Sequence, residues 1–250
     1  MDLTEEEQAA LDHLKDLHAW FSETTTGLLL TPNTQATGIL VTTAGMAYRL
    51  IRGIISQGEG GSNDCVSSHL RSLLEATLNM CYIFVEPSTI ADRAEAYLYY
   101  TEREELKGVR RIRDLMKQHK LAAMSAFCTV ADLDKKEAEM VAHLATLTPN
   151  DKWPPNIEQL ANTLKAHGEY AIGYYWFSRQ VHMQLSAATG LLSQTGDAIE
   201  YNAEVETSNL LGEIKTASVV FVELCRLLQQ NTNLPPLPEP RFSWVSTLTL

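Results

Sequence analysis

The chain has 250 residues, of which 45% are hydrophobic and 20% are charged. This is the composition of an ordinary globular protein, which excludes a largely disordered chain and allows one large domain or two small ones. The net charge of −11 at pH 7 disfavours nucleic-acid binding through a uniformly basic surface.

Apolar runs are short in this chain, and its first residues are acidic. The run Val219–Val222 is followed by Glu223 and Arg226, whereas a membrane span needs about 20 apolar residues. An export signal needs a basic start followed by an apolar stretch, and residues 1–7 provide neither. We therefore predict a cytoplasmic protein that has no membrane partner.

Apolar residues recur every three or four positions along most of the chain, which predicts amphipathic helices. The first helix opens at a capping box, Thr4 to Glu7, whose hydroxyl and carboxylate bind free backbone amides. Glycines and prolines mark the ends of later helices because they interrupt helical hydrogen bonding. The helices expected in chain order cover roughly residues 4–24, 35–56, 62–86, 88–120, 131–147, 156–166, 169–185 and 203–230.

Two segments lack a helical period. Residues 190–201 are expected to form a loop or a short hairpin, and the prolines of Leu234–Pro240 require an extended chain. No alternation of strands and helices is present. We therefore predict an all-α fold: a single multi-helix bundle of about seven to eight helices over residues 1–232, followed by an extended Pro-rich tail with an apolar end over residues 233–250.

The cysteines favour reduced core thiols over metal ligands or disulfides. None of them forms a Cys-x-x-Cys pair, most fall on apolar helical stripes, and no His-Glu-x-x-His spacing is present. We therefore predict neither a metal site nor a cofactor. The four cysteines are Cys65, Cys81, Cys128 and Cys225.

Two predicted helices carry polar rows on one flank. Arg71, Glu75 and Asn79 follow each other at intervals of four residues beside a face of leucines, so we expect a partly buried Arg–Glu pair that holds helix register. The second row contains His182, the side chain best suited to general acid–base catalysis at neutral pH. A histidine bound by neighbouring hydroxyls inside a bundle is the favoured interpretation, because the strand-to-helix Gly-x-Ser-x-Gly context of many serine nucleophiles is absent. This row consists of Tyr170, Tyr174, Ser178 and His182.

A basic stretch, Arg103–Lys120, holds seven cations against three anions, among them Arg110, Arg111 and Arg113. A solvated helix face that complements the helix dipole is the favoured interpretation, and an RNA-binding surface is the alternative. Arg113 and His119 have the Arg-x5-His form of HEPN ribonucleases, but such a spacing is expected about once by chance in this composition. Tyr97, Tyr99 and Tyr100 are interpreted as core or interface residues rather than as base-stacking residues.

The segments Arg71–Ile83, Arg93–Tyr97 and Tyr174–His182 together resemble an uncharacterised family of bacterial all-helical proteins, a domain of unknown function. The resemblance spans residues 62–188 and leaves out the first two helices and the tail. It implies a helical bundle in which Arg71, Glu75, Arg93, Ser178 and His182 converge. Members of such families are often similar to toxin or phage-defence components, some of them HEPN-like.

The leading functional prediction is a bacterial helical-bundle interaction protein that forms homo-oligomers and belongs to a defence or toxin system. Its tail would dock on a neighbouring chain by adding a strand or filling a groove. The alternative is a HEPN-like, metal-independent endoribonuclease, with His182 as acid–base catalyst, Arg71 or Arg93 stabilising phosphate, and Arg103–Lys120 binding RNA. A small-molecule sensor with a pocket lined by Tyr170, Tyr174 and His182 stays open as a third prediction.

Overall fold

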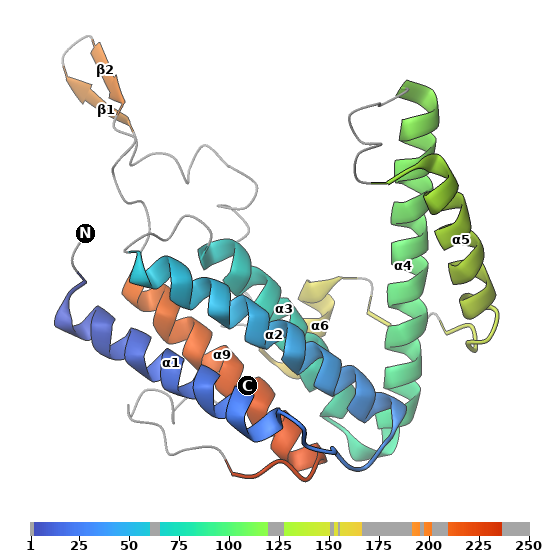
Figure 1. Cartoon of the computed structure of the whole chain (residues 1–250), viewed down its shortest axis with the longest axis horizontal. Helices are drawn as coiled ribbons and strands as arrows, with labels where there is room; N and C mark the ends of the chain where they lie inside the picture. Colours follow the sequence, from blue (N-terminus) through green and yellow to red (C-terminus); the bar gives the residue numbers. More distant parts are fainter. Residues whose placement is uncertain are drawn as a thin grey trace. The chain divides into compact units, whose positions relative to one another are not determined.

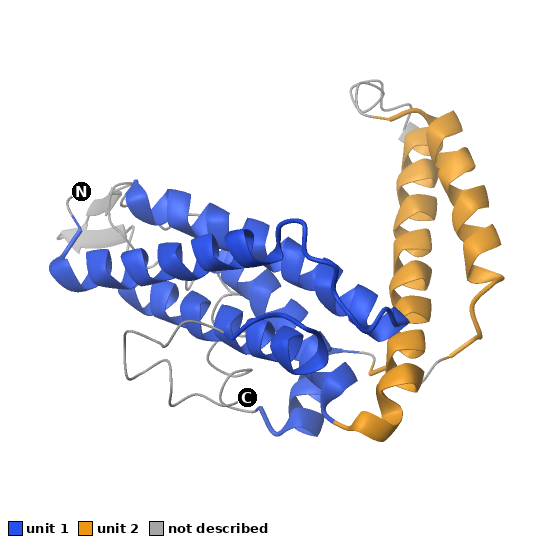
Figure 2. Ribbon diagram, turned by 60° about the horizontal axis from the view of Figure 1, so that its bottom comes forward, with its two compact units in different colours: residues 1–85, 156–250 blue, residues 86–155 orange. Residues whose placement is uncertain are grey.

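The computed structural model describes residues 3–60, 66–119, 128–150, 153–154, 156–166, 192–195, 198–201 and 210–236. The chain divides into two compact units (Figure 2). Unit 1 comprises residues 1–85 and 156–250, and unit 2 comprises residues 86–155.

Unit 1 is a bundle whose helices run side by side (Figure 1). The last helix, α9, packs against α1, α2 and α3, while α2 also packs against α1 and α3. The short helix α6 packs against α3. The bounds of these helices are α1 Glu5–Thr25, α2 Gln35–Glu59, α3 Val66–Phe84, α6 Ile157–Leu164 and α9 Leu210–Asn231.

Threonine side chains cap the first two helices, and the cap of α1 is the one predicted from the sequence. Thr4 and Glu7 form the capping box at the start of α1: the Glu7 N–H donates to Thr4 Oγ1 (3.2 Å), and the Thr4 N–H donates to Glu7 Oε2 (2.8 Å). Thr34 caps α2 through its hydroxyl, which accepts from the Thr37 N–H at 3.1 Å. These contacts satisfy backbone amides that the first helical turn leaves without partners.

The core of unit 1 is the apolar side that each helix turns towards α9. Leu14 of α1, Leu40 of α2, Leu73 of α3 and Phe221 of α9 are all completely buried. Phe21 links two of these helices, because its ring lies 5.6 Å from the ring of Phe221. Burying a leucine or phenylalanine stabilises a fold by about 1.5–3 kcal/mol, so these contacts hold the bundle together.

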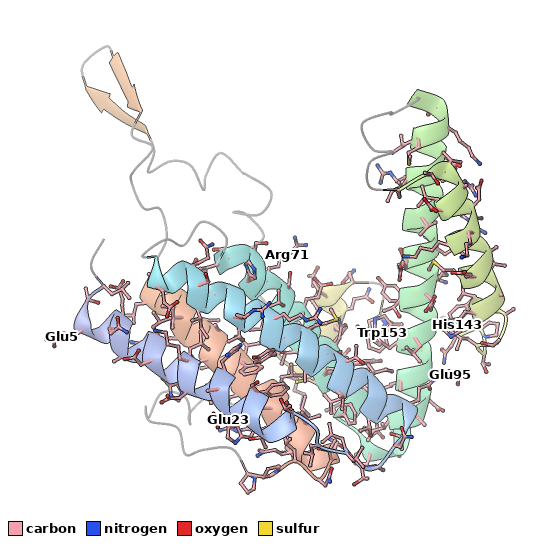
Figure 3. All side chains as sticks on the ribbon, in the orientation of Figure 1. Glu5, Glu23, Arg71, Glu95, His143 and Trp153 are labelled. Atoms are coloured by element: carbon pink, nitrogen blue, oxygen red, sulfur yellow. The ribbon has the colours of Figure 1, made fainter. Side chains whose placement is uncertain are left out.

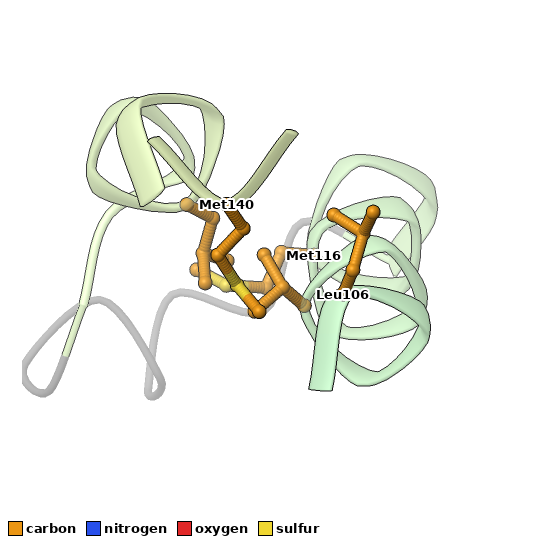
Figure 4. Close-up of a cluster of buried hydrophobic side chains, with 5 residues drawn as sticks. Leu106, Met116 and Met140 are labelled. Carbon is orange, nitrogen blue, oxygen red and sulfur yellow. The ribbon is translucent and has the colours of Figure 1, made fainter. Parts of the chain in front are cut away.

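Unit 2 is a helical hairpin. It contains the short 3₁₀ helix η1 (Pro87–Thr89), the long helix α4 (Ile90–His119) and α5 (Val130–Leu144). A small apolar core lies between α4 and α5 (Figure 4). Its buried members are Leu106, Val109, Met116, Leu133 and Met140.

The all-α class is confirmed, and helices occur at the predicted places wherever the structure describes the chain. Residues 190–201 include the hairpin that was one of two alternatives: β1 (Leu192–Thr195) pairs antiparallel with β2 (Ala198–Tyr201). The division into two units was not predicted. The predicted helix 169–185 and residues 237–250 of the predicted tail lie outside the described residues, so the boundary at 232/233 stays a prediction.

Among the described helices, α2 is long and apolar enough to cross a membrane by length and composition, with a mean hydropathy of 1.2 over an 18-residue window. Sequence analysis did not single it out. The core helix of a bundle passes the same test, and Leu40, Ile51 and Ile54 of α2 are completely buried in unit 1. The helix is therefore weak evidence for a membrane span.

Two glycines of α2 differ in the room that each would leave for an added Cβ atom. This difference predicts how an alanine at each position would change the stability of the protein. A Cβ on Gly53 would lie 2.6 Å from Nε2 of His69, whereas a Cβ on Gly45 would meet nothing within 4 Å. Alanine in a helix interior is more stable than glycine by about 0.5–1 kcal/mol. We expect Gly45→Ala to raise the free energy of unfolding by that amount in urea denaturation. Gly53→Ala should give a smaller gain or a loss, and an equal gain at both positions would contradict the close packing of His69.

Candidate functional site

The polar row predicted on the third helix lies on α3, in unit 1, with Arg71 labelled in Figure 3. The Arg71 side chain is half-buried, but Glu75 is exposed and forms no ion pair with any described residue. The predicted Arg71–Glu75 pair is therefore wrong. The physical reason is that the flank of α3 at residue 75 faces water, where an ion pair stabilises a helix by only a few tenths of a kcal/mol.

The same flank of α3 has a buried polar residue, Ser67, one turn before Arg71. Ser67 Oγ donates a 2.6 Å hydrogen bond to Oε1 of Glu213, and both side chains are buried. Ser67 lies in the first turn of α3 and Glu213 in the first turn of α9. Because helix N-termini carry partial positive charge, the buried carboxylate lies where its own helix stabilises it. This bond joins the starts of two helices from distant parts of the chain.

Neither member of this pair was predicted from the sequence. Glu213 falls between Leu210 and Ala217 on the apolar stripe of α9, where a carboxylate is unexpected. Buried carboxylates need a hydrogen-bond partner, so an acidic residue at a core position signals a hidden donor. The position of Ser67, four residues before Arg71 on the same flank, was the available signal for that donor.

Two of the described thiols, those of Cys81 and Cys225, are poor nucleophiles. Burial raises the pKa of the Cys81 thiol to about 12, and the negative charge of Glu223 adds to this shift. Burial raises the pKa of Cys225 as well. Both thiols are therefore protonated at neutral pH, and the thiolate is the reactive form. The cysteines whose free thiols the structure describes are Cys81, Cys128 and Cys225.

Glu223 is itself the second acidic residue of α9 that lies partly inside the bundle. Burial raises the pKa of its carboxyl group, while the neighbouring guanidinium of Arg226 opposes that shift. The two side chains form an ion pair one turn apart on α9. Arg226 therefore compensates part of the cost of burying the Glu223 charge.

The structure does not test whether the remaining predicted catalytic residues meet. Tyr170, Tyr174, Ser178 and His182 lie outside the described residues, so their predicted meeting with Arg71 stays a prediction. Arg93 lies on α4 in unit 2, where its NH2 group is 3.4 Å from Glu86 Oε2. Within the described ranges, no group of three or more His, Cys, Asp or Glu side chains is arranged to hold a metal ion.

Acidic residues of α5 pair with the basic stretch on α4. Arg110 Nε lies 2.7 Å from Glu137 Oε1, and Arg113 binds the other oxygen of the same carboxylate. Lys117 Nζ lies 3.3 Å from Asp134 Oδ1. In these pairs, carboxylates of α5 already bind the arginine and lysine side chains. An RNA backbone would need the same side chains, because phosphate binding depends on available lysine and arginine charges.

One cation of the predicted binding set, Arg111, is exposed and forms no ion pair with a described residue, so its charge stays available to a phosphate. The aromatic residues further up α4 are used in packing: Trp153 lies with its ring 4.8 Å from that of Tyr97 and 6.4 Å from that of Tyr100 (Figure 3). Rings packed on a buried tryptophan do not present their faces to nucleic-acid bases.

Residues 37–199 match the model of DUF5677, a family of unknown function. The chain belongs to this family. No curated protein and no solved structure matches the chain. The predicted resemblance to an uncharacterised domain family is confirmed by the DUF5677 match, while bacterial origin and likeness to HEPN ribonucleases stay predictions.

The DUF5677 match is wider than the predicted resemblance, because it includes most of α2, which was placed outside it. It also covers α3, unit 2, α6 and β1. Two helices of the unit 1 bundle, α1 and α9, lie outside the matched residues. Ser67 is therefore within the DUF5677 region, whereas its partner Glu213 is not.

The Ser67–Glu213 bond generates a test with a matched control. Ser67→Ala removes a hydroxyl donor from a buried carboxylate, which costs about 1–3 kcal/mol. Ser72 is exposed on the same helix, and Ser72→Ala should change stability by less than about 0.5 kcal/mol. Urea denaturation of both variants measures the difference, and equal stabilities would show that the buried bond does not stabilise unit 1.

A second pair of variants tests the pairing of the basic stretch. Glu137→Gln removes the carboxylate that Arg110 and Arg113 share, so we expect hairpin stability to fall by about 1–2 kcal/mol. Glu139→Gln is the control, because Glu139 is exposed and 3.9 Å from Lys135, a contact that contributes almost nothing. An RNA-binding α4 would bind a single-stranded oligonucleotide more tightly once two cations are released. We expect no such gain in a fluorescence-anisotropy titration of Glu137→Gln.

Proposed function

We propose that this protein is a helical-bundle interaction protein whose C-terminal tail, residues 233–250, docks on a second copy of the chain through the apolar residues that follow Pro236. The observation that carries this proposal is the way the chain is held after α9 ends at Asn231. The segment does not simply continue into solvent. At Asn233 it is tied to the loop between α1 and α2.

Asn233 makes the contacts that hold the segment. Its backbone N–H donates to the Thr31 carbonyl (3.2 Å), its Oδ1 accepts from the Thr31 N–H (3.0 Å), and its Nδ2 donates to the Leu29 carbonyl (3.2 Å). Leu234, the next residue, is buried. Chain ends are usually poorly ordered unless contacts tie them down, so these contacts fix the point at which the tail departs.

The rest of the tail, residues 237–250, lies outside the described residues. Pro235 and Pro236 are exposed. The rest of the tail contains five large apolar residues: Phe242, Trp244, Val245, Leu248 and Leu250. A tail that starts from a fixed point loses less conformational entropy when it binds, which favours docking on a neighbour.

The described polar groups support an interaction role over an enzymatic one. Glu213 is bound by Ser67, Glu223 by Arg226, and the thiols of Cys81 and Cys225 are held protonated. The ribonuclease alternative loses much of its RNA-binding face to the ion pairs between α4 and α5. A role in phage defence or a toxin system follows from the family resemblance alone.

Removal of the tail tests the proposal. We expect a chain ending at Pro236 to have a lower mass by light scattering than the full chain at the same concentration, because Asn233 and Leu234 remain but the apolar residues are lost. A full-length variant with Phe242→Ser and Trp244→Ser is the matched control for length, and it should behave like the shortened chain.

An unchanged mass in both variants would exclude tail docking. The same preparations test the alternative function. RNA cleavage by the full chain that is lost in His182→Ala, with the fold retained by circular dichroism, would replace this proposal with the ribonuclease.

A further inference from the structure

One end of unit 1 is built from segments without charged residues. Residues 24–48 contain no Asp, Glu, Lys or Arg, and neither do residues 227–238, although 20% of the whole chain is charged. The first segment forms the end of α1, the following loop and the first half of α2. The second forms the end of α9 and the start of the tail.

The structure brings these two segments into contact. The hydrogen bonds of Asn233 to Leu29 and Thr31 join the α9 end to the α1–α2 loop, and Figure 1 shows the red end of α9 beside the blue loop. We call residues 26–38 together with 231–236 the uncharged end. Apolar side chains are exposed there: Leu29 is 85% exposed, and Pro32, Pro235 and Pro236 are also exposed.

We propose that the uncharged end is the surface on which a second copy of this chain docks, and that it receives the second copy's tail. This inference rests on the function proposed above and names the receiving surface. It goes beyond that function because the tail alone does not say where on the neighbour it binds.

The net charge of the chain favours a second copy as the partner that binds the uncharged end. Two copies that each carry a net charge of −11 repel each other over most of their surfaces, and the uncharged end lets them approach without placing like charges together. A basic protein or a cation would be drawn to the acidic surface elsewhere instead. A two-fold symmetric contact pairs the same patch on both copies, so one uncharged patch is sufficient.

The position and length of the tail support the same surface. The described start of the tail, residues 233–236, is part of the uncharged end, so it lies at the contact between two copies that meet there. The fourteen residues after Pro236 reach up to about 45 Å when extended. This reach exceeds the length of the first three turns of α2, about 16 Å, so the apolar residues of one tail reach the partner's uncharged end and α2 beyond it. Met46, 57% exposed on α2, extends the apolar surface in that direction.

The test places a charge on the uncharged end. Leu29→Glu changes a side chain that is already exposed, so it leaves the fold intact, and we expect it to weaken self-association at least tenfold in sedimentation equilibrium. Val141→Glu is the matched control, because Val141 is 44% exposed on α5 in unit 2. It should associate like the wild type. Thr31→Lys is a second variant of the same surface, since Thr31 uses its backbone in the bonds to Asn233 and its side chain is exposed.

The outcomes separate this inference from the function on which it rests. If the chain ending at Pro236 associates weakly while Leu29→Glu and Thr31→Lys associate like wild type, tail docking stands and the uncharged end is the wrong surface. An equal loss of self-association in Val141→Glu would also show that the uncharged end is not the docking surface. A wild-type chain that stays monomeric overturns both proposals. Binding of wild-type monomer to neutral phosphatidylcholine vesicles, lost in Leu29→Glu, would show that a lipid surface and not a second copy is the occupant.

Discussion

The packing of α9 against α1, α2 and α3 is the interaction on which unit 1 depends. Each of the other three helices has one apolar side, and a helix of that kind is stable only when another element covers it. Phe221 and its neighbours on α9 supply that cover to all three at once. The residues that match DUF5677 include α3 and most of α2 but not the helix that covers them. The described helices of the family region in unit 1 are therefore packed against a helix from outside that region.

The same dependence explains where charge is buried. A helix that contacts three others has little surface left for solvent, so two of its carboxylates, Glu213 and Glu223, lie inside or at the edge of the bundle. Each has a specific partner, Ser67 on α3 and Arg226 on α9. Buried polar pairs of this kind add little net stability compared with apolar residues. They do raise the free energy of any packing of the helices that separates the two partners, because a buried polar group is then left without its partner. Here they specify which helices lie side by side.

Local patterns predicted the helices well, because the apolar period and the caps act over a few residues. Thr4 with Glu7 is such a pattern, and both its hydrogen bonds are present. Pairing between residues far apart in the sequence was not predictable.

The partner of Arg110 is 27 positions away and that of Ser67 is 146 positions away, and no local rule connects them. The division into two units was missed for a related reason, since Pro87 marks the end of α3 equally well whether or not a new unit begins there. The predicted set around His182 depends on residues outside the described part of the chain.

The order of the helices along the chain has a consequence for synthesis. Unit 2 is formed by neighbouring helices, so α4 and α5 find each other over a short loop and fold rapidly once made. Unit 1 is different, because α1, α2 and α3 precede unit 2 while α9 is the last of the described helices. A nascent chain therefore carries three helices that pack on one another, while the apolar surface that α9 covers stays exposed until α9 has been synthesised. Premature termination before α9 leaves a product whose unit 1 core is not closed.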